Sequence, residues 1–219
     1  MRNIYDEENE LSVNTNTTDK KEDQSELSIK WKEALAQIDY GFDLNTSSVL
    51  MFGDIAEGTL YDIMLRIRGL LHMRDDDKKK DPINIIINSD GGDVYEALGI
   101  IDFIQSLDIK VNTICRGRAM SAAALLLCAG TGIRAASKNS TIMFHEISSG
   151  IYGKSSDMKA NVQHTEKLED ILVNIISENS NQNKEFWKDK ILKDYYLSPQ
   201  EALDLGVVDT IIQPKTTRG

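Results

Sequence analysis

Apolar residues follow two patterns along this chain: helical faces with a spacing of three and four residues, and short unbroken runs. Residues 59–73 and 94–107 show the helical spacing and predict two amphipathic helices. Their inward faces are expected to consist of Leu60, Ile63, Met64, Ile67, Leu70 and Leu71 in the first helix, and of Val94, Ala97, Leu98, Ile101 and Ile104 in the second. The runs at 48–55, 83–88 and 110–117 predict strands, and 83–88 ("INIIIN") is typical of a strand buried on both sides.

Strand and helix therefore alternate at a spacing of roughly 30 residues, which is the length of a βαβ unit. This alternation predicts an α/β fold with right-handed crossovers. Past the third strand, a helix rich in alanine and leucine begins at Ser121. The remaining expected elements are strands at 133–137 and 141–147, helices at 158–180 and 198–206, and a last strand at 207–213.

The long helix at 158–180 has an apolar stripe that must be buried somewhere. The stripe consists of Met158, Val162, Leu168, Leu172, Ile175 and Ile176. A glycine-flanked segment, 150–153, leads into the helix, so we expect it to leave the βα core and to pack on a partner. The alternative is an ordinary helix that folds back on the sheet.

The composition is that of a globular protein with one domain: 219 residues, 41% hydrophobic and 27% charged. No apolar run reaches the roughly 18 residues that a membrane span needs, and the first residues have no apolar secretory region. The net charge of −10 argues against nucleic acid as a partner. Residues 1–40 carry ten acidic and five basic side chains and predict a largely disordered tail before a domain at 41–219, with a short helix at 27–38.

Two cysteines, Cys115 and Cys128, lie in apolar contexts and match no zinc or redox spacing. We expect buried neutral thiols in a reducing cytosol. No metal site and no cofactor is predicted.

Ser121 stands at the mouth of its apolar helix, where a serine most often serves as an N-cap. A nucleophilic role requires a base and a third group that orients the base. Among the three histidines, His72 and His164 lie in polar surroundings and are expected at the surface, whereas His145 ends a strand. The "SDGG" turn at 89–92 follows a buried strand, and its glycines suit the backbone cradle that stabilises an oxyanion.

Four stretches of the sequence match the motifs of one family in the same order, and three of them contain the SDGG turn, Ser121 and His145. They are "INSDGG" (87–92), "TICRGRAMSAAALLLCAGT" (113–131), "NSTIMFHE" (139–146) and "LSPQEALDLGVVDTII" (197–212). From residue 51 to about 213 the chain resembles ClpP, the proteolytic subunit of the Clp protease, a serine peptidase of the crotonase-like superfamily. Gly92 and Ser121 are 29 residues apart and His145 and Asp194 are 49 apart, as in the family.

The resemblance implies a role for each matching residue. Ser121 is the expected nucleophile, His145 the general base and Asp194 the acid that orients it; Asp189, five residues away, is the alternative acid. The N–H groups of Gly92 and Ala122 are the expected oxyanion hole. The implied fold is the crotonase-like spiral of ββα and βαβ units, with a protruding handle at about 147–180.

The resemblance also implies partners and a location. It predicts a homo-oligomer of two stacked heptameric rings in the cytoplasm, with unfolded polypeptides as substrates and a Clp-type AAA+ unfoldase as a partner. The chain departs from the family pattern at Asp90, Ala122, Glu146, Ile147 and Lys193, and the family's axial-loop segment is not recognisable. Peptidase chemistry is therefore the firmer expectation and unfoldase docking the weaker one, and the divergence points to a phage- or organelle-type relative.

Three alternatives remain open. The first is a maturation protease of the phage capsid type, which needs no ATPase. The second is an inactive ring subunit, against which the three filled triad positions argue. The third is an acyl-CoA enzyme of the same superfamily, which the peptidase spacing disfavours.

Overall fold

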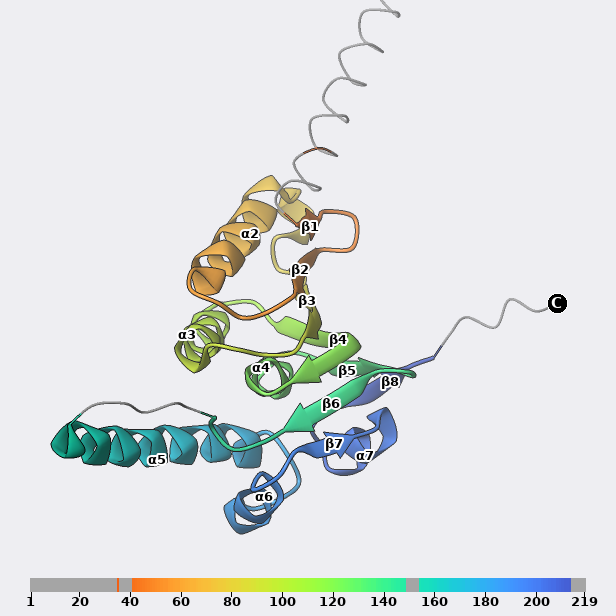
Figure 1. The fold of residues 1–219 in the computed structure, drawn as a ribbon. Helices are drawn as coiled ribbons and strands as arrows, with labels where there is room; N and C mark the ends of the chain where they lie inside the picture. The colour runs from red at the N-terminus through yellow and green to blue at the C-terminus, as the bar shows by residue number, and fades with distance from the viewer. Residues whose placement is uncertain (1–34, 36–40, 149–153, 214–219) are drawn as a thin grey trace, which may run out of the picture. The chain divides into compact units, whose positions relative to one another are not determined.

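The computed structural model describes Leu35 and residues 41–148 and 154–213, and its helices and strands belong to the unit Tyr40–Gly219 (Figure 1). The expected acidic tail, the short helix predicted at 27–38 (Leu35 excepted) and the whole glycine-flanked segment 150–153 lie outside the described residues. The elements in chain order are β1 (Phe42–Asp43), β2 (Ser48–Phe52), α2 (Thr59–Met73), η1 (Asp76–Lys78), β3 (Ile83–Ser89), α3 (Val94–Gln105), β4 (Val111–Met120), α4 (Ala122–Cys128), β5 (Arg134–Ser137), β6 (Thr141–Phe144), α5 (Ser155–Glu178), α6 (Lys184–Lys190), β7 (Tyr195–Leu197), α7 (Pro199–Asp204) and β8 (Thr210–Ile212).

The strands of the described residues form one mixed sheet in the order β1-β2-β3-β4-β5-β8; β6 also pairs with β4, and β7 pairs with β6. The pairs from β2 to β5 are parallel, so α2 and α3 are the crossovers between neighbouring parallel strands. Figure 1 shows α2, α3 and α4 in a row alongside this part of the sheet. The mixed α/β architecture agrees with the expected fold class.

Strand β4 pairs with two different strands beyond β3. Its residues Thr113–Cys115 pair with β5, and Arg118–Met120 pair with β6. Gly117 lies between these segments with φ at +98°, a backbone conformation that favours glycine. The sequence prediction ended this strand at Gly117 and was wrong, because the chain bends there and continues as strand to Met120.

The amphipathic helices follow their predicted faces closely. Helix α2 spans the predicted residues and buries Ile63, Ile67 and Leu70. Helix α3 also buries Ile100, which the predicted face did not include. Strand β3 is not buried on both sides as expected: burial alternates along it, and Asn84, Ile86 and Asn88 stay partly exposed.

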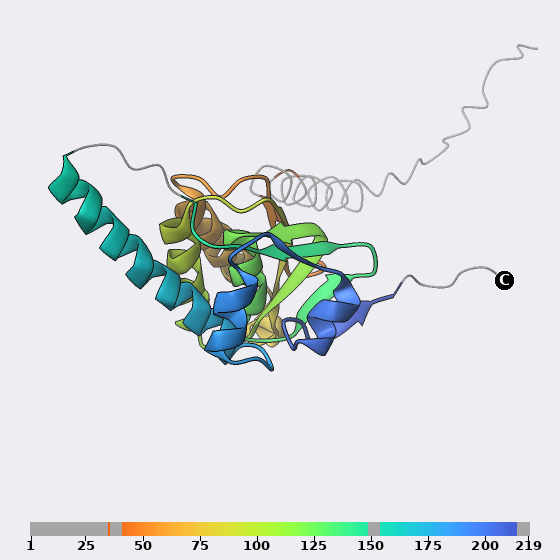
Figure 2. The same ribbon diagram turned by 60° about the horizontal axis from the view of Figure 1, so that its bottom comes forward.

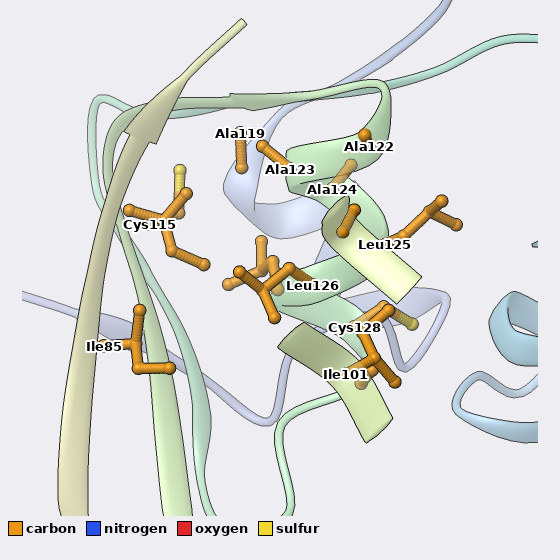
Figure 3. Close-up of a cluster of buried hydrophobic side chains, with 14 of the residues drawn as sticks. Ile85, Ile101, Cys115, Ala119, Ala122, Ala123, Ala124, Leu125, Leu126 and Cys128 are labelled. Atoms are coloured by element: carbon orange, nitrogen blue, oxygen red, sulfur yellow. The ribbon is translucent and has the colours of Figure 1, made fainter. Parts of the chain in front are cut away.

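Helix α4 is buried along its whole length, including every residue from Ala122 to Cys128. Ile85 and Cys115 face it from the sheet and Ile101 faces it from α3 (Figure 3). Alanine allows the helix to approach these neighbours closely, which explains why a short helix without a polar face is stable here. The residue before it, Ser121, is thereby attached to the most buried part of the core.

Helix α5 divides into two halves. Its buried residues are Leu168, Leu172, Val173 and Ile176, all in the C-terminal half, while Met158 and Val162 in the N-terminal half are exposed. The first turns of α5 extend away from the rest of the unit in both ribbon views (Figure 2). The expectation that the whole stripe leaves the core is therefore wrong for the second half, which packs on its own chain.

Candidate active site

Ser121 occupies a sharp turn between β4 and α4. Its φ of 54° and ψ of −125° are rare for a residue with a side chain, and such strain is characteristic of functional turns. Its N–H donates a hydrogen bond to the Met143 carbonyl oxygen at 2.8 Å, which attaches the turn to the end of β6. The side chain makes no capping bond to α4, so Ser121 stands at the N-cap position without acting as a cap.

His145 is held against Ser121 by the sheet. Met120 pairs with Met143 in the parallel β4–β6 ladder, so the residues that follow the two strands lie side by side. The His145 Nε2 atom lies 2.8 Å from the Ser121 Oγ atom, the distance of a hydrogen bond. The imidazole is mostly buried, with 25% of its side-chain surface exposed.

Asp194 reaches His145 through an antiparallel pair. Phe144 of β6 pairs with Tyr195 of β7, which places the next residue of one strand opposite the preceding residue of the other. The Asp194 Oδ1 atom lies 3.8 Å from the His145 Nδ1 atom, which is longer than a hydrogen bond, and the carboxylate is 58% exposed. The alternative acid, Asp189, lies in α6 with its carboxylate 3.7 Å from the Lys190 ammonium group.

Two glycines let the turn after β3 approach Ser121. A Cβ atom on Gly91 would lie 2.5 Å from the Met120 carbonyl oxygen, and one on Gly92 would lie 2.1 Å from the Ile55 carbonyl oxygen. The turn is held by Ile55, whose N–H bonds to the Gly91 carbonyl at 2.8 Å. Neither position can carry a side chain without moving the backbone.

The N–H groups of Gly92 and Ala122 have no acceptor within residues 41–148 and 154–213. Gly92, Ser121, Ala122 and His145 line one cavity of about 340 Å³. Two free backbone donors that face the same cavity as a serine hydroxyl can stabilise a negative oxygen that forms there.

The walls of the cavity are mainly apolar and come from four helices or helix ends. They include Val94 of α3, Leu125 of α4, Leu172 and Ile176 of α5, and Ile191 after α6. Three carboxylate residues, Asp90, Glu146 and Glu169, also line it. The sequence analysis did not predict these three residues in the site: Asp90 and Glu146 adjoin expected site residues, whereas Glu169 reaches the cavity only through the packing of α5.

The other histidines and the cysteines lie elsewhere. His72 is exposed at the end of α2, and His164 is exposed on α5, where its Nε2 atom lies 2.5 Å from the Tyr95 hydroxyl oxygen. Cys115 and Cys128 are free and buried, and burial raises their thiol pKa values to about 11 and about 12. Both thiols are therefore neutral, as expected.

The part of the chain that the structure describes holds no group of three or more His, Cys, Asp or Glu residues able to bind a metal ion. Among the same residues, no helix has the length and apolar character required to span a membrane.

Comparison with known proteins gives consistent matches. The family model described as Clp protease matches residues 35–215. The ATP-dependent Clp protease proteolytic subunit 1 of Prochlorococcus marinus subsp. pastoris is 37% identical over 150 residues, which cover 68% of this chain and 76% of that protein. The ATP-dependent Clp protease proteolytic subunit of Deinococcus radiodurans is 37% identical over 151 residues, covering 68% and 74% of the two chains.

Proposed function

The chain belongs to the Clp protease family, and on that premise we propose that it is a serine endopeptidase that hydrolyses peptide bonds of unfolded polypeptides as the proteolytic subunit of a Clp-type assembly. The observation that carries the proposal is the 2.8 Å contact between the Ser121 Oγ and His145 Nε2 atoms, beside two free backbone donors. This arrangement satisfies the geometric requirement for an activated serine.

In the proposed reaction, His145 accepts the Ser121 hydroxyl proton at Nε2 while Oγ attacks the carbonyl carbon of the peptide bond. The carbonyl oxygen becomes negative and receives hydrogen bonds from the Gly92 and Ala122 N–H groups. The imidazolium then gives its proton to the leaving amine, and an acyl-enzyme remains on Ser121. Water, deprotonated by His145, attacks the ester and releases the second product.

Asp194 has the supporting role in this proposal. A carboxylate at Nδ1 keeps the proton on that nitrogen, so that Nε2 is free to act as the base, and stabilises the imidazolium. The 3.8 Å separation means that the subunit alone holds Asp194 near His145 but outside hydrogen-bond distance. Asp194 is preferred to Asp189 because the β6–β7 pairing brings Asp194 opposite His145.

We further propose that the subunits form two stacked heptameric rings, with the N-terminal half of α5 as the contact between rings. The exposed apolar residues Met158 and Val162 support this, because the described part of the chain does not bury them. Delivery of substrate by a Clp-type AAA+ unfoldase, and a location in the cytoplasm that suits two unpaired thiols, belong to the same proposal.

The test combines a fluorophosphonate probe with native mass spectrometry. The wild-type protein should become labelled at Ser121 and appear as a high-mass oligomer, and Ser121→Ala should lose both labelling and peptide hydrolysis. Ser106→Ala, which changes an exposed serine at the end of α3, is the matched control and should retain both. Hydrolysis that persists in Ser121→Ala would contradict the proposal.

A further inference from the structure

The cavity beside Ser121 is unusual in its charge. Its lining, all within the described residues, includes the acidic residues Asp90, Glu146 and Glu169 but no lysine or arginine. Asp90 is neutralised from outside the cavity, because its carboxylate lies 2.6 Å from the Arg118 guanidinium group. Glu146 and Glu169, by contrast, form no ion pair with a lysine or arginine among the described residues.

The nearest cation does not neutralise Glu169. Lys188 of α6 lies close enough to act on it, but the Lys188 ammonium group pairs with Asp170 at 2.7 Å. Glu169 is partly buried on the face of α5 that also carries Leu172 and Ile176 toward the cavity, since these residues follow it at three and seven positions. Glu169 thus lies at the edge of an apolar surface and forms no ion pair with Lys188.

Glu146 approaches the same place from the other side of the site. It follows His145 directly, and its N–H donates a hydrogen bond to the Ile191 carbonyl oxygen at 2.8 Å. Burial first, and then the negative charges of Glu146 and Asp170, raise the pKa of Glu169. A cation placed between them would relieve both the burial and the repulsion.

A lysine or arginine side chain fits an apolar cavity with acidic residues at its edge, because it combines an apolar stem with a positive end. The stem would lie against Leu125, Leu172 and Ile176, and the charged end would reach the carboxylates at the edge. The Gly92 and Ala122 N–H groups line this same cavity. Because they would bind the oxygen of the attacked carbonyl group, the side chain that enters the cavity is the one on that same residue.

We propose that Glu169, assisted by Glu146, makes this cavity select a lysine or arginine residue on the acyl side of the bond that is cut. The inference rests on the proposed peptidase function and adds to it a class of cleavage site. Neither carboxylate takes part in bond making; each contacts the substrate side chain.

The experiment uses the full-length protein and three internally quenched peptides that differ only in the residue before the cleaved bond. This residue is lysine, norleucine (the same stem without the ammonium group) or glutamate, and mass spectrometry of the products locates the cut. The wild-type kcat/KM should be about fivefold higher for lysine than for norleucine, the size of one partly exposed ion pair, and lowest for glutamate. Glu169→Gln should bring the lysine-to-norleucine ratio close to one, and Glu146→Gln should lower it by a smaller factor.

The matched control is Glu178→Gln, which removes one negative charge from the exposed C-terminal end of the same helix and should keep the wild-type ratio. A wild-type ratio at or below one, or a ratio that neither variant lowers, would overturn the inference while leaving the peptidase function intact. Failure of the wild type to cleave any of the peptides or to react with the fluorophosphonate probe would overturn the proposed function, and this inference with it.

Discussion

Ser121 and Asp194, the two ends of the proposed triad, are held by very different parts of the molecule. Ser121 adjoins a helix that is buried at every residue, and its backbone bonds to the end of β6. Asp194 lies between α6 and β7, is 58% exposed and stays 3.8 Å from the imidazole. The core therefore determines the position of the proposed nucleophile, whereas the position of the proposed acid depends on an exposed segment between α6 and β7.

The largest effect is expected on the tightly held side. Gly92→Ala should lower kcat by about 10³-fold, because its Cβ would collide with the Ile55 carbonyl oxygen and displace an oxyanion donor. The control is Gly58→Ala, since Gly58 also has a positive φ, of +94°, but open space around it. Equal losses in steady-state peptide hydrolysis for the two variants would mean that backbone strain, and not the lost donor, is responsible.

On the loosely held side, Asp194→Asn should reduce kcat/KM by about 10²-fold. This is less than the roughly 10⁴-fold typical of a buried triad carboxylate, because Asp194 is exposed and outside hydrogen-bond distance. Asp189→Asn is the matched comparison and should leave the rate of peptide hydrolysis near the wild-type value. If Asp189→Asn is the more damaging change, the assignment of the acid is wrong.

The sequence predicted the tightly held side better than the loose one. The apolar spacing located α2 and α3, and the family motifs predicted Ser121, His145 and Gly92 from strands and turns with strong local signals, whereas Asp194 was predicted only from its spacing to His145. Strand β7 has three residues and β1 has two, too few to show a period. Helix α6, with the sequence "KEFWKDK", also lacked an apolar repeat long enough to be recognised.

The features that the sequence did not predict depend on contacts between residues that are far apart in the chain. The apolar stripe of α5 runs along both halves of the helix in the sequence, yet only its second half is buried. The presence of Glu169 at the cavity likewise depends on where α5 crosses α4. No local pattern records such a crossing.

A contact between subunits should act on the acid more than on the serine. Val162→Asp introduces a charge on the exposed half of α5 and should yield species of lower mass. Peptide hydrolysis should be about tenfold slower, because Asp194 would lie less precisely beside His145. Asn161→Asp adds the same charge at an exposed polar position and should assemble normally. Native mass spectrometry gives the masses; a Val162→Asp protein with the wild-type mass and rate would exclude this half of α5 as the contact.

The smallest effect is expected for Trp187 of α6, which packs on β6 and β7 near Asp194. The buried Trp187 ring packs against Phe144 and Tyr195, and its Nε1–H donates to the Ser180 Oγ atom at 2.8 Å. Trp187→Phe keeps an aromatic ring but loses that bond and leaves part of the buried indole volume empty, so the free energy of unfolding should fall by at least about 1 kcal/mol. Urea denaturation measures this, with the exposed Tyr196→Phe as a control that should be neutral; equal midpoints for the two variants would show that the indole N–H contributes nothing.

The pairing of β6 with β7 also sets an order of events during protein synthesis. Ser121 and His145 leave the ribosome first, and Asp194 follows 49 residues after His145. At about 5–20 residues per second, this interval lasts roughly 2 to 10 seconds. During this interval the nascent chain contains the proposed nucleophile and base but lacks part or all of α6 and the residues from Asp194 to the end of β7. The proposed triad therefore cannot be complete until at least 49 residues beyond His145 have been translated.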